Sequence, residues 1–181
     1  MKMVCPWWLC FTFDNRIRIF FHNPETILNP YINPGNTVID IGPGMGYFTI
    51  PLARLVGPTG HVTAIDIQAK MLSALVRRAE KCRVSERITP YLAETSSLGN
   101  HQRADFILAF YMVHEVRDKE RFFSEIYNLL KPGGLFLLVE PIIHVSKKSF
   151  LRTLQTAKGI GLVVKDTPKI RMSYSVLLTC K

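Results

Sequence analysis

VIDIGPGMGYFTIPLA, residues 38–53, joins a short apolar run to three closely spaced glycines and then to a second apolar segment. A strand that ends in a glycine-rich turn and opens into a helix brings backbone N–H groups close to a ligand. Glycine permits both the unusual torsions and the close approach that such a turn needs. Gly42, Gly44 and Gly46 could also form a tight turn that binds no ligand. The spacing of the three glycines helps to decide between these interpretations.

The spacing of these glycines disfavours a phosphate ligand. A dinucleotide-binding turn reads G-x-G-x-x-G, which would put its third glycine at position 47, where this chain has Tyr47. Here the turn reads G-x-G-x-G with Pro43 inside it, and the Gly-Lys-Ser/Thr ending of a phosphate-binding P-loop is absent. The sequence therefore disfavours a nicotinamide-dependent oxidoreductase.

Two acidic residues indicate what the turn binds instead. Asp40 lies two residues before Gly42, and its carboxylate would repel a phosphate and attract a cation. Asp66 ends the next apolar run, where a carboxylate can accept both hydroxyls of a ribose. Together the two acids favour a nucleoside that carries positive charge. S-adenosylmethionine, which has an ammonium, a sulfonium and no phosphate, fits that description.

The rest of the chain alternates apolar runs with amphipathic stretches, which is typical of a doubly wound α/β sheet. Continuous apolar runs favour parallel strands that are covered on both faces. After Glu140 a helix and then two β-type runs without a helix between them predict an antiparallel hairpin on the sheet edge. We expect strands at 37–41, 61–66, 88–93, 105–110, 135–140, 160–166 and 174–180, and helices at 68–82, 118–130 and 146–158, the second helix stopping at KPGG (131–134).

The first 35 residues are interpreted as a helical and apolar extension, and residues 36–181 as the ligand-binding domain. Asp14 can cap a helix over residues 15–21, and Asn23 with Pro24 can begin another over 25–32. Trp7 and Trp8 would either form an apolar lid over the site or fill a core.

Composition describes an ordinary globular chain with an unusual charge. The 181 residues are 48% hydrophobic, and the net charge is +9. The basic residues form no long run, which disfavours nucleic acid without excluding it and leaves peripheral membrane contact open. No segment is long enough to span a bilayer. The four cysteines form no metal-type cluster with histidine, so we expect no metal and reduced thiols in a cytoplasmic protein, with a Cys5–Cys10 bridge or soft-metal site as the alternative.

With these motifs in hand, the sequence resembles the class I S-adenosylmethionine-dependent methyltransferases, an enzyme family with a seven-stranded sheet. The resemblance covers residues 37–180 and rests on VIDIGPGMG, Asp66, LAFYMVHEV after the fourth strand and LLKPGGLFLLVEP at the fifth. It implies that residues 42–46 run along the cofactor and that Asp40 lies near the amino-acid end of that cofactor. It further implies that Ile67 packs on the adenine, that Glu94 faces the adenine amine and that Phe110 lies beside the cofactor.

Candidates for the substrate side follow the fourth and fifth strands. Tyr111 and His114 are the predicted catalytic residues, with His114 deprotonating a hydroxyl or phenol if Glu115 or another acid orients it. His144 follows the fifth strand. A hydrogen-bonded loop histidine and a solvated Glu115 are the alternatives. We expect methyl transfer to a small, apolar molecule; the alternatives are an RNA or protein methyltransferase and a catalytically silent S-adenosylmethionine-binding module. The oligomeric state stays open.

Overall fold

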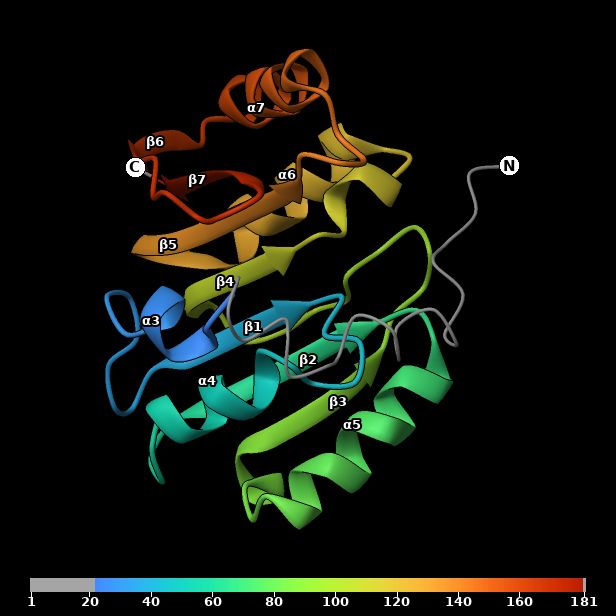
Figure 1. Ribbon diagram of the computed structural model, residues 1–181, viewed down its shortest axis with the longest axis vertical. Helices are drawn as coiled ribbons and strands as arrows, with labels where there is room; N and C mark the ends of the chain where they lie inside the picture. Colours follow the sequence, from blue (N-terminus) through green and yellow to red (C-terminus); the bar gives the residue numbers. More distant parts are fainter. Residues whose placement is uncertain (1–21, 181) are drawn as a thin grey trace.

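A computed structural model describes residues 22–180 of the chain (Figure 1). Strands and helices alternate along most of it, as the apolar periodicity predicts. In chain order the elements are α3 (Pro24–Leu28), β1 (Thr37–Ile41), α4 (Thr49–Leu55), β2 (His61–Asp66), α5 (Ala69–Lys81), η1 (Ser85–Arg87), β3 (Ile88–Leu92), β4 (Ala104–Phe110), η2 (Val113–Glu115), α6 (Lys119–Leu129), β5 (Leu130–Pro141), α7 (Lys147–Ile160), β6 (Val163–Asp166) and β7 (Ser173–Thr179).

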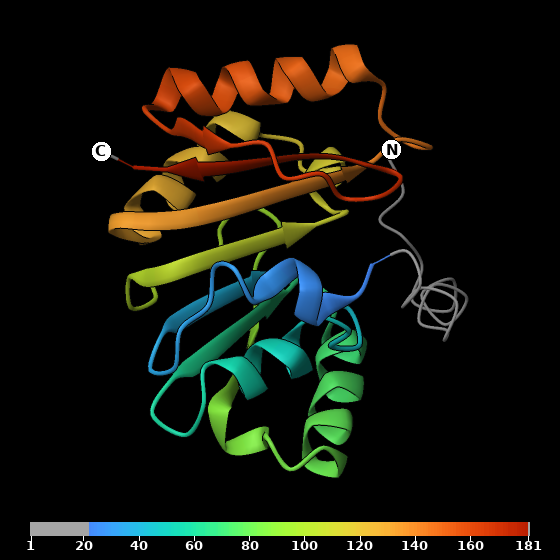
Figure 2. The same cartoon turned by 60° about the vertical axis from the view of Figure 1, so that its left-hand side comes forward.

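The seven strands within residues 22–180 form one sheet in the order β3-β2-β1-β4-β5-β7-β6 (Figures 1 and 2). The pairs from β3 through β5 are parallel, whereas β7 is antiparallel to both β5 and β6. The predicted doubly wound sheet and its antiparallel hairpin at the edge are therefore confirmed. After β3 the chain crosses to the other side of β1 and forms β4 there. The adjacent strands β1 and β4 are therefore the topological switch point of the sheet.

Helices cover both faces of the sheet because its central strands are apolar on both sides. Phe123 and Ile126 of α6 and Phe150 of α7 pack in one hydrophobic cluster with alternate residues of β1, β4 and β5. Leu52 of α4 and Leu75 of α5 pack in a second cluster, against the other face of the same strands. The two clusters fix the positions of the parallel strands, so the carboxyl ends of these strands form one defined edge of the sheet.

Capping residues define several helix ends. The Asn23 side chain accepts hydrogen bonds from two backbone N–H groups at the start of α3, where Pro24 occupies the first turn, as predicted. Asp118 caps α6 and Ser146 caps α7 in the same way. Gly161, in the left-handed conformation at φ 111°, ends α7.

Three predicted boundaries are wrong. The strand expected at 160–166 begins only at Val163, because α7 continues to Ile160. The helix expected over residues 25–32 ends at Leu28, because Pro30 has no backbone N–H with which to continue the helical hydrogen bonds. The KPGG segment does follow the end of α6, but it lies inside β5, where the pairing with β4 shifts register between Ala104 and Phe106. The strand expected at 135–140 is therefore longer.

The described part of the N-terminal extension packs on the domain. Leu28 and Ile32 are buried, and the ring of Tyr31 stacks on Phe106 of β4. The boundary at residue 35 stays a prediction. The expectations for Trp7, Trp8, Asp14, Cys5 and Cys10 fall outside the described residues. No helix within 22–180 is long and apolar enough to cross a membrane.

Candidate active site

The predicted site residues gather at one edge of the sheet. Asp40 and the glycine turn follow β1, Asp66 ends β2, His114 lies after β4, and Glu140 is near the end of β5. Carboxyl ends of parallel strands meet at a common edge, and ligands of open α/β sheets bind there beside the switch point. The switch point of this sheet is at the adjacent strands β1 and β4, so the fold brings the sequence motifs together there.

The glycine turn has the backbone geometry that the sequence predicts. Gly42, Gly44 and Gly46 all have positive φ, at 68°, 56° and 87°, which is the left-handed region that favours glycine. A side chain on Gly42 would meet Met112, and one on Gly46 would meet Leu75. A Cβ built on Gly44 meets no atom within 4 Å, so the space above this residue is open. The turn therefore offers an uncovered stretch of backbone at Gly44.

Asp40 lies in β1, two residues before the glycine turn, and is buried. One of its carboxylate oxygens accepts a hydrogen bond of 2.6 Å from the hydroxyl of Thr49, the first residue of α4. This contact ties the strand before the turn to the helix after it. Thr49 was not singled out from the sequence, although a polar residue among the buried positions of α4 is a signal that could have identified it.

Asp66 is buried and accepts hydrogen bonds from backbone N–H groups, one of them in the glycine turn. Only 8% of the residue is exposed, and its carboxylate accepts a 2.9 Å hydrogen bond from the Gln68 N–H. Burial raises the pKa of Asp66 to about 6, although backbone hydrogen bonds from Gln68, Gly44 and Ile67 act in the opposite direction. The negative charge of Glu115 contributes to the increase. Asp66 is thus a carboxylate in contact with the glycine turn.

Three other predicted cofactor residues lie around this point. Ile67 follows Asp66 and is exposed, so its side chain is accessible to an apolar ring. Glu94 is exposed and forms an isolated bridge with Ser97 just after β3. Phe110 is buried at the end of β4, where its ring centre lies 4.3 Å from that of Phe48, between the glycine turn and α4. All three have positions compatible with their predicted roles.

Tyr111 is held by a hydrogen-bond network. Its hydroxyl lies 2.6 Å from the hydroxyl of Ser173 and 2.9 Å from Nε2 of His22. Its backbone has φ 65°, in the left-handed region that a bulky side chain rarely adopts. This network joins the N-terminal segment, the end of β4 and β7. No local pattern indicates the role of His22, because its partners are 89 and 149 residues away.

His114 pairs with a buried acid that sequence reasoning did not select. Nδ1 of His114 lies 2.5 Å from Oε2 of Glu140, and its backbone N–H donates to Oε1 at 3.0 Å. Glu140 is only 2% exposed. The orienting acid is therefore Glu140 rather than Glu115. An acid at the end of an apolar run is the signal that also identified Asp66.

This pair sets the charge and the tautomer of His114. The hydrogen bond to Glu140 raises the pKa of His114 above its ordinary value, although partial burial opposes the increase. With Nδ1–H donating to the carboxylate, the lone pair of the neutral ring is on Nε2. Glu115 raises the pKa of both His114 and Asp66, so its charge acts on both groups. His144 lies 6.3 Å from His114, ring centre to ring centre.

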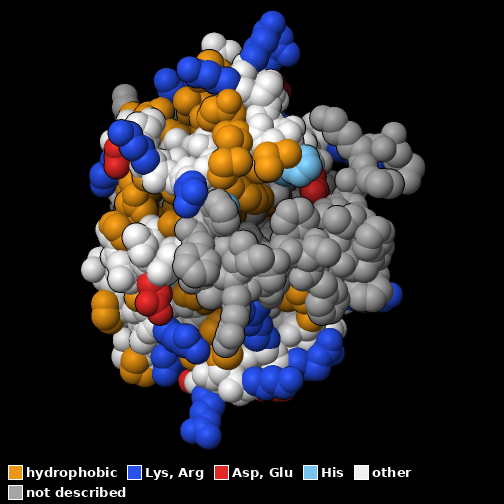
Figure 3. All heavy atoms as spheres, in the orientation of Figure 1, with side chains coloured by type: hydrophobic (Ala, Val, Ile, Leu, Met, Phe, Trp, Pro, Cys, Tyr) orange, Lys and Arg blue, Asp and Glu red, His pale blue; other side chains and the backbone are white. Residues whose placement is uncertain are grey.

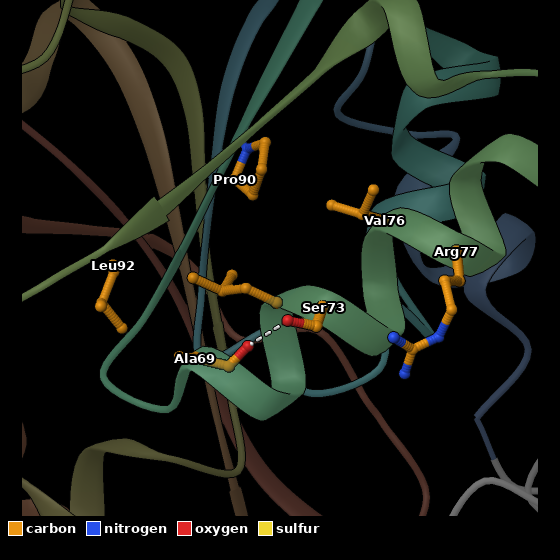
Figure 4. A pocket seen from close by; sticks show the side chains of 7 residues that line it. Ala69, Ser73, Val76, Arg77, Pro90 and Leu92 are labelled. Atoms are coloured by element: carbon orange, nitrogen blue, oxygen red, sulfur yellow. Dashed lines mark hydrogen bonds between the residues drawn. The ribbon is translucent and has the colours of Figure 1, made fainter.

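A groove of about 450 Å³ lies outside this edge, between α5 and the edge strand β3 (Figure 4). Pro90 and Leu92 of β3 border it on one side, and Val76 and Arg77 of α5 on the other. None of the predicted cofactor or catalytic residues lines it. The chemistry-bearing side chains belong to the carboxyl edge of the sheet instead.

Comparison with known proteins identifies the family. A family model described as a methyltransferase domain matches residues 32–168, which is most of the chain and includes every predicted cofactor and catalytic residue. This protein belongs to the methyltransferase domain family. The predicted methyltransferase family is thereby confirmed.

Individual relatives of this methyltransferase agree with that assignment. The ubiquinone/menaquinone biosynthesis C-methyltransferase of Klebsiella pneumoniae is 30% identical over 154 residues, covering 77% of this chain and 58% of the relative. A SAM-dependent methyltransferase of Aquifex aeolicus has the same fold, with a TM-score of 0.87, 20% identity and coverage of 98% of this chain and 100% of that one. A SAM-dependent O-methyltransferase of Thermotoga maritima superposes with a TM-score of 0.70, at 21% identity over 87% and 64% of the two chains. The methyltransferase described here spans little more than half the length of its first curated relative.

Proposed function

We propose that the protein transfers a methyl group from S-adenosylmethionine to a small, apolar acceptor that carries an ionisable hydroxyl, such as a phenol or an enol. The observation that carries this proposal is the His114–Glu140 pair beside a cofactor turn. Glu115, whose charge raises the pKa of both His114 and Asp66, links the two parts of the site. A base next to the cofactor suits an acceptor that must lose a proton.

The residues present fit S-adenosylmethionine. The backbone at Gly44 faces open space in which a ligand can approach, and Asp66 is a carboxylate next to that backbone. We propose that Asp66 accepts the ribose hydroxyls and that Ile67 and Glu94 hold the adenine. Gly42, Pro43, Gly46, Asp40 and Phe110 shape the turn around the amino-acid end. When bound, the cofactor supplies an activated methyl carbon for in-line displacement.

His114 is the proposed general base. Its Nε2 lone pair takes the hydroxyl proton of the acceptor, and the resulting oxygen anion supplies the electron pair for the new bond, at oxygen or at a conjugated carbon. Glu140 holds Nδ1–H and stabilises the imidazolium that forms, so it acts as a positioning residue. Tyr111, with its hydroxyl bonded to His22 and Ser173, supports the wall of the site beside Phe110.

The apolar character of the acceptor is supported by the relatives and by the walls of the site. The Klebsiella relative is named for C-methylation in ubiquinone and menaquinone biosynthesis, and both of these quinones are apolar molecules. Phe48, Phe110 and Tyr111 form an aromatic group next to the turn. Aromatic residues at this position favour an apolar ring over a charged macromolecular acceptor.

Transfer of a labelled methyl group tests the proposal. The purified protein is incubated with methyl-labelled S-adenosylmethionine and with small-molecule, RNA or protein fractions. We expect label in the organic-extractable small-molecule fraction. Label in RNA or protein alone would assign the acceptor to that class instead, and binding without transfer to any fraction would identify a silent cofactor-binding module.

Protonation of Asp66 gives a testable pH dependence of cofactor binding. The ionised carboxylate accepts ribose hydroxyls, and this form is lost as the pH falls through the raised pKa of about 6. The dissociation constant for S-adenosylmethionine should therefore rise about tenfold between neutral pH and one unit below that pKa. Titration calorimetry measures it. Asp66→Asn should bind more weakly and lose this pH dependence; an equally steep dependence in the variant would remove Asp66 from the site.

Exchange of Glu140 for glutamine should shift the pH profile of kcat. The hydrogen bond to the Glu140 carboxylate raises the pKa of His114, and the base works only when unprotonated. Activity should thus fall as the pH drops through this raised pKa, and in Glu140→Gln the decline should move to lower pH. Glu120→Gln, an exposed acid of α6, is the control and should keep the profile. An unchanged pH profile of kcat in Glu140→Gln would show that Glu140 does not act on the general base.

A cytoplasmic location is part of the proposal. Cys82 and Cys180 are free thiols, as is usual in a reducing compartment. Fractionation of cells that express the tagged chain tests this, and accumulation outside the cytoplasmic compartment would contradict it.

A further inference from the structure

The charge of the chain is concentrated at its C-terminal end. Residues 141–181 contain eight Lys or Arg and one acid, Asp166, so they supply +7 of the net charge of +9. Of these, residues 142–180 form the turn after β5, α7 and the β6–β7 hairpin. Glu140, the acid just before them, is buried against His114 and adds no charge to the surface. One part of the molecule is thus strongly basic.

The same part exposes apolar side chains. Ile143 is 75% exposed in the turn after β5, and Ile142 beside it is exposed as well. The Ile142 N–H donates to the carbonyl of Met172 in the β6–β7 loop, so the two loops are joined and their exposed side chains are neighbours. Leu151 lies one turn into α7, on the side of Lys147 and Lys148.

We define these side chains as the docking face. Figure 3 shows hydrophobic side chains gathered over the half of the view that carries β5, β7 and α7, with Lys and Arg side chains around them. The apolar members of the docking face are Ile142, Ile143, Leu151 and Met172, and its exposed cations are Lys147, Lys148, Lys169 and Arg171.

We propose that the docking face binds the surface of an anionic phospholipid bilayer. Exposed aliphatic side chains that enter the boundary of the acyl chains, surrounded by cations that reach the lipid phosphates, are the combination that holds a protein at such a surface. A folded protein partner of mainly acidic surface would match the cations but would leave the protruding Ile143 without an apolar environment. Charge complementarity and apolar exposure together favour the bilayer.

The docking face borders the candidate active site. Met172 accepts a hydrogen bond from the Tyr111 hydroxyl through its carbonyl at 3.5 Å, and His144, next to Ile143, lies beside His114. Docking would therefore place the edge of the site at the lipid surface. An apolar acceptor dissolved in the bilayer could then reach the base without crossing water. This last step rests on the proposed function, whereas the docking itself does not.

Sedimentation with phospholipid vesicles tests the docking face. The purified full chain is mixed with vesicles of phosphatidylcholine, alone or with phosphatidylglycerol as the anionic lipid. We expect binding to the anionic vesicles that weakens as salt is raised. Lys147→Glu with Lys148→Glu should lower the partition coefficient by at least about 30-fold, because two cations are lost and two anions are added. Both changes lie in the first turn of α7, where acids suit the helix dipole, so folding should be retained.

Matched controls distinguish the docking face from general charge. Arg77→Glu with Lys81→Glu makes the same charge change on α5 and should have a much smaller effect. Ile143→Asp should lower the partition roughly tenfold, whereas Leu92→Asp, at a 55% exposed position on β3, should not.

Equal losses in the test and control variants would overturn the proposal. So would vesicle binding that is absent at low salt, or binding of RNA or a second copy of the chain through Lys147, Lys148 and Ile143 instead. Vesicle binding requires no methyl transfer, so its failure is separate from a failure of the proposed activity.

Discussion

Replacing His114 by glutamine should lower kcat by roughly 100- to 10,000-fold, the usual contribution of a positioned general base. Glutamine can still bond to Glu140 and keep the local hydrogen bonds, but it has no lone pair of suitable basicity. The affinity for S-adenosylmethionine should stay within about twofold, because His114 acts on the acceptor rather than on the cofactor. Steady-state kinetics with the acceptor found by methyl labelling, together with calorimetry, measures both quantities.

His61→Gln is the matched control for this prediction. His61 begins β2 at the opposite edge of the sheet, where its ring bonds to Thr89. Its replacement should leave kcat unchanged. If His114→Gln transfers methyl at the normal rate, the acceptor needs no base and the histidine is a structural loop residue that Glu140 stabilises.

Gly44→Val should abolish measurable cofactor binding, with a loss of more than about 100-fold in affinity, while the protein still folds. The added side chain meets no protein atom, but it occupies the space through which the ligand must approach the backbone. The φ of 56° makes valine strained there at a cost of about 1–2 kcal/mol in stability. Calorimetry with S-adenosylmethionine and thermal unfolding measure the two effects separately.

Gly133→Val separates ligand blockage from backbone strain. Gly133 has φ 74° and open space around its Cβ position, yet it lies near the start of β5, at the edge of the sheet away from the turn. This variant should lose similar stability and keep its affinity for the cofactor. Similar affinity losses at both glycines would mean that Gly44 acts through folding alone.

The parts of the fold that the sequence predicts are those that short-range physics determines. The first two strands begin and end where their apolar runs do, because strands covered on both faces need such runs. The glycine turn is predictable since positive φ at alternate residues requires glycine. Asn23 and Ser146 begin helices because their side chains satisfy free backbone N–H groups.

The remaining features depend on contacts between distant segments. Glu140 meets His114 only because β4 and β5 pair in parallel with a particular register, and that register contains a shift at KPGG which no local pattern indicates. The hydroxyl of Tyr111 is bonded from both ends of the described chain, by His22 and Ser173. Burial likewise sets the raised pKa of Asp66, and burial is a property of the assembled edge.

The central claim is that the glycine turn and Asp66 bind a positively charged nucleoside rather than a dinucleotide phosphate. Isothermal titration calorimetry of the purified wild-type chain with S-adenosylmethionine, and separately with NAD, tests this claim most directly. Saturable binding of S-adenosylmethionine at one site, with no heat of binding for NAD, is the predicted result. Saturable binding of NAD in the absence of any S-adenosylmethionine binding would contradict the account.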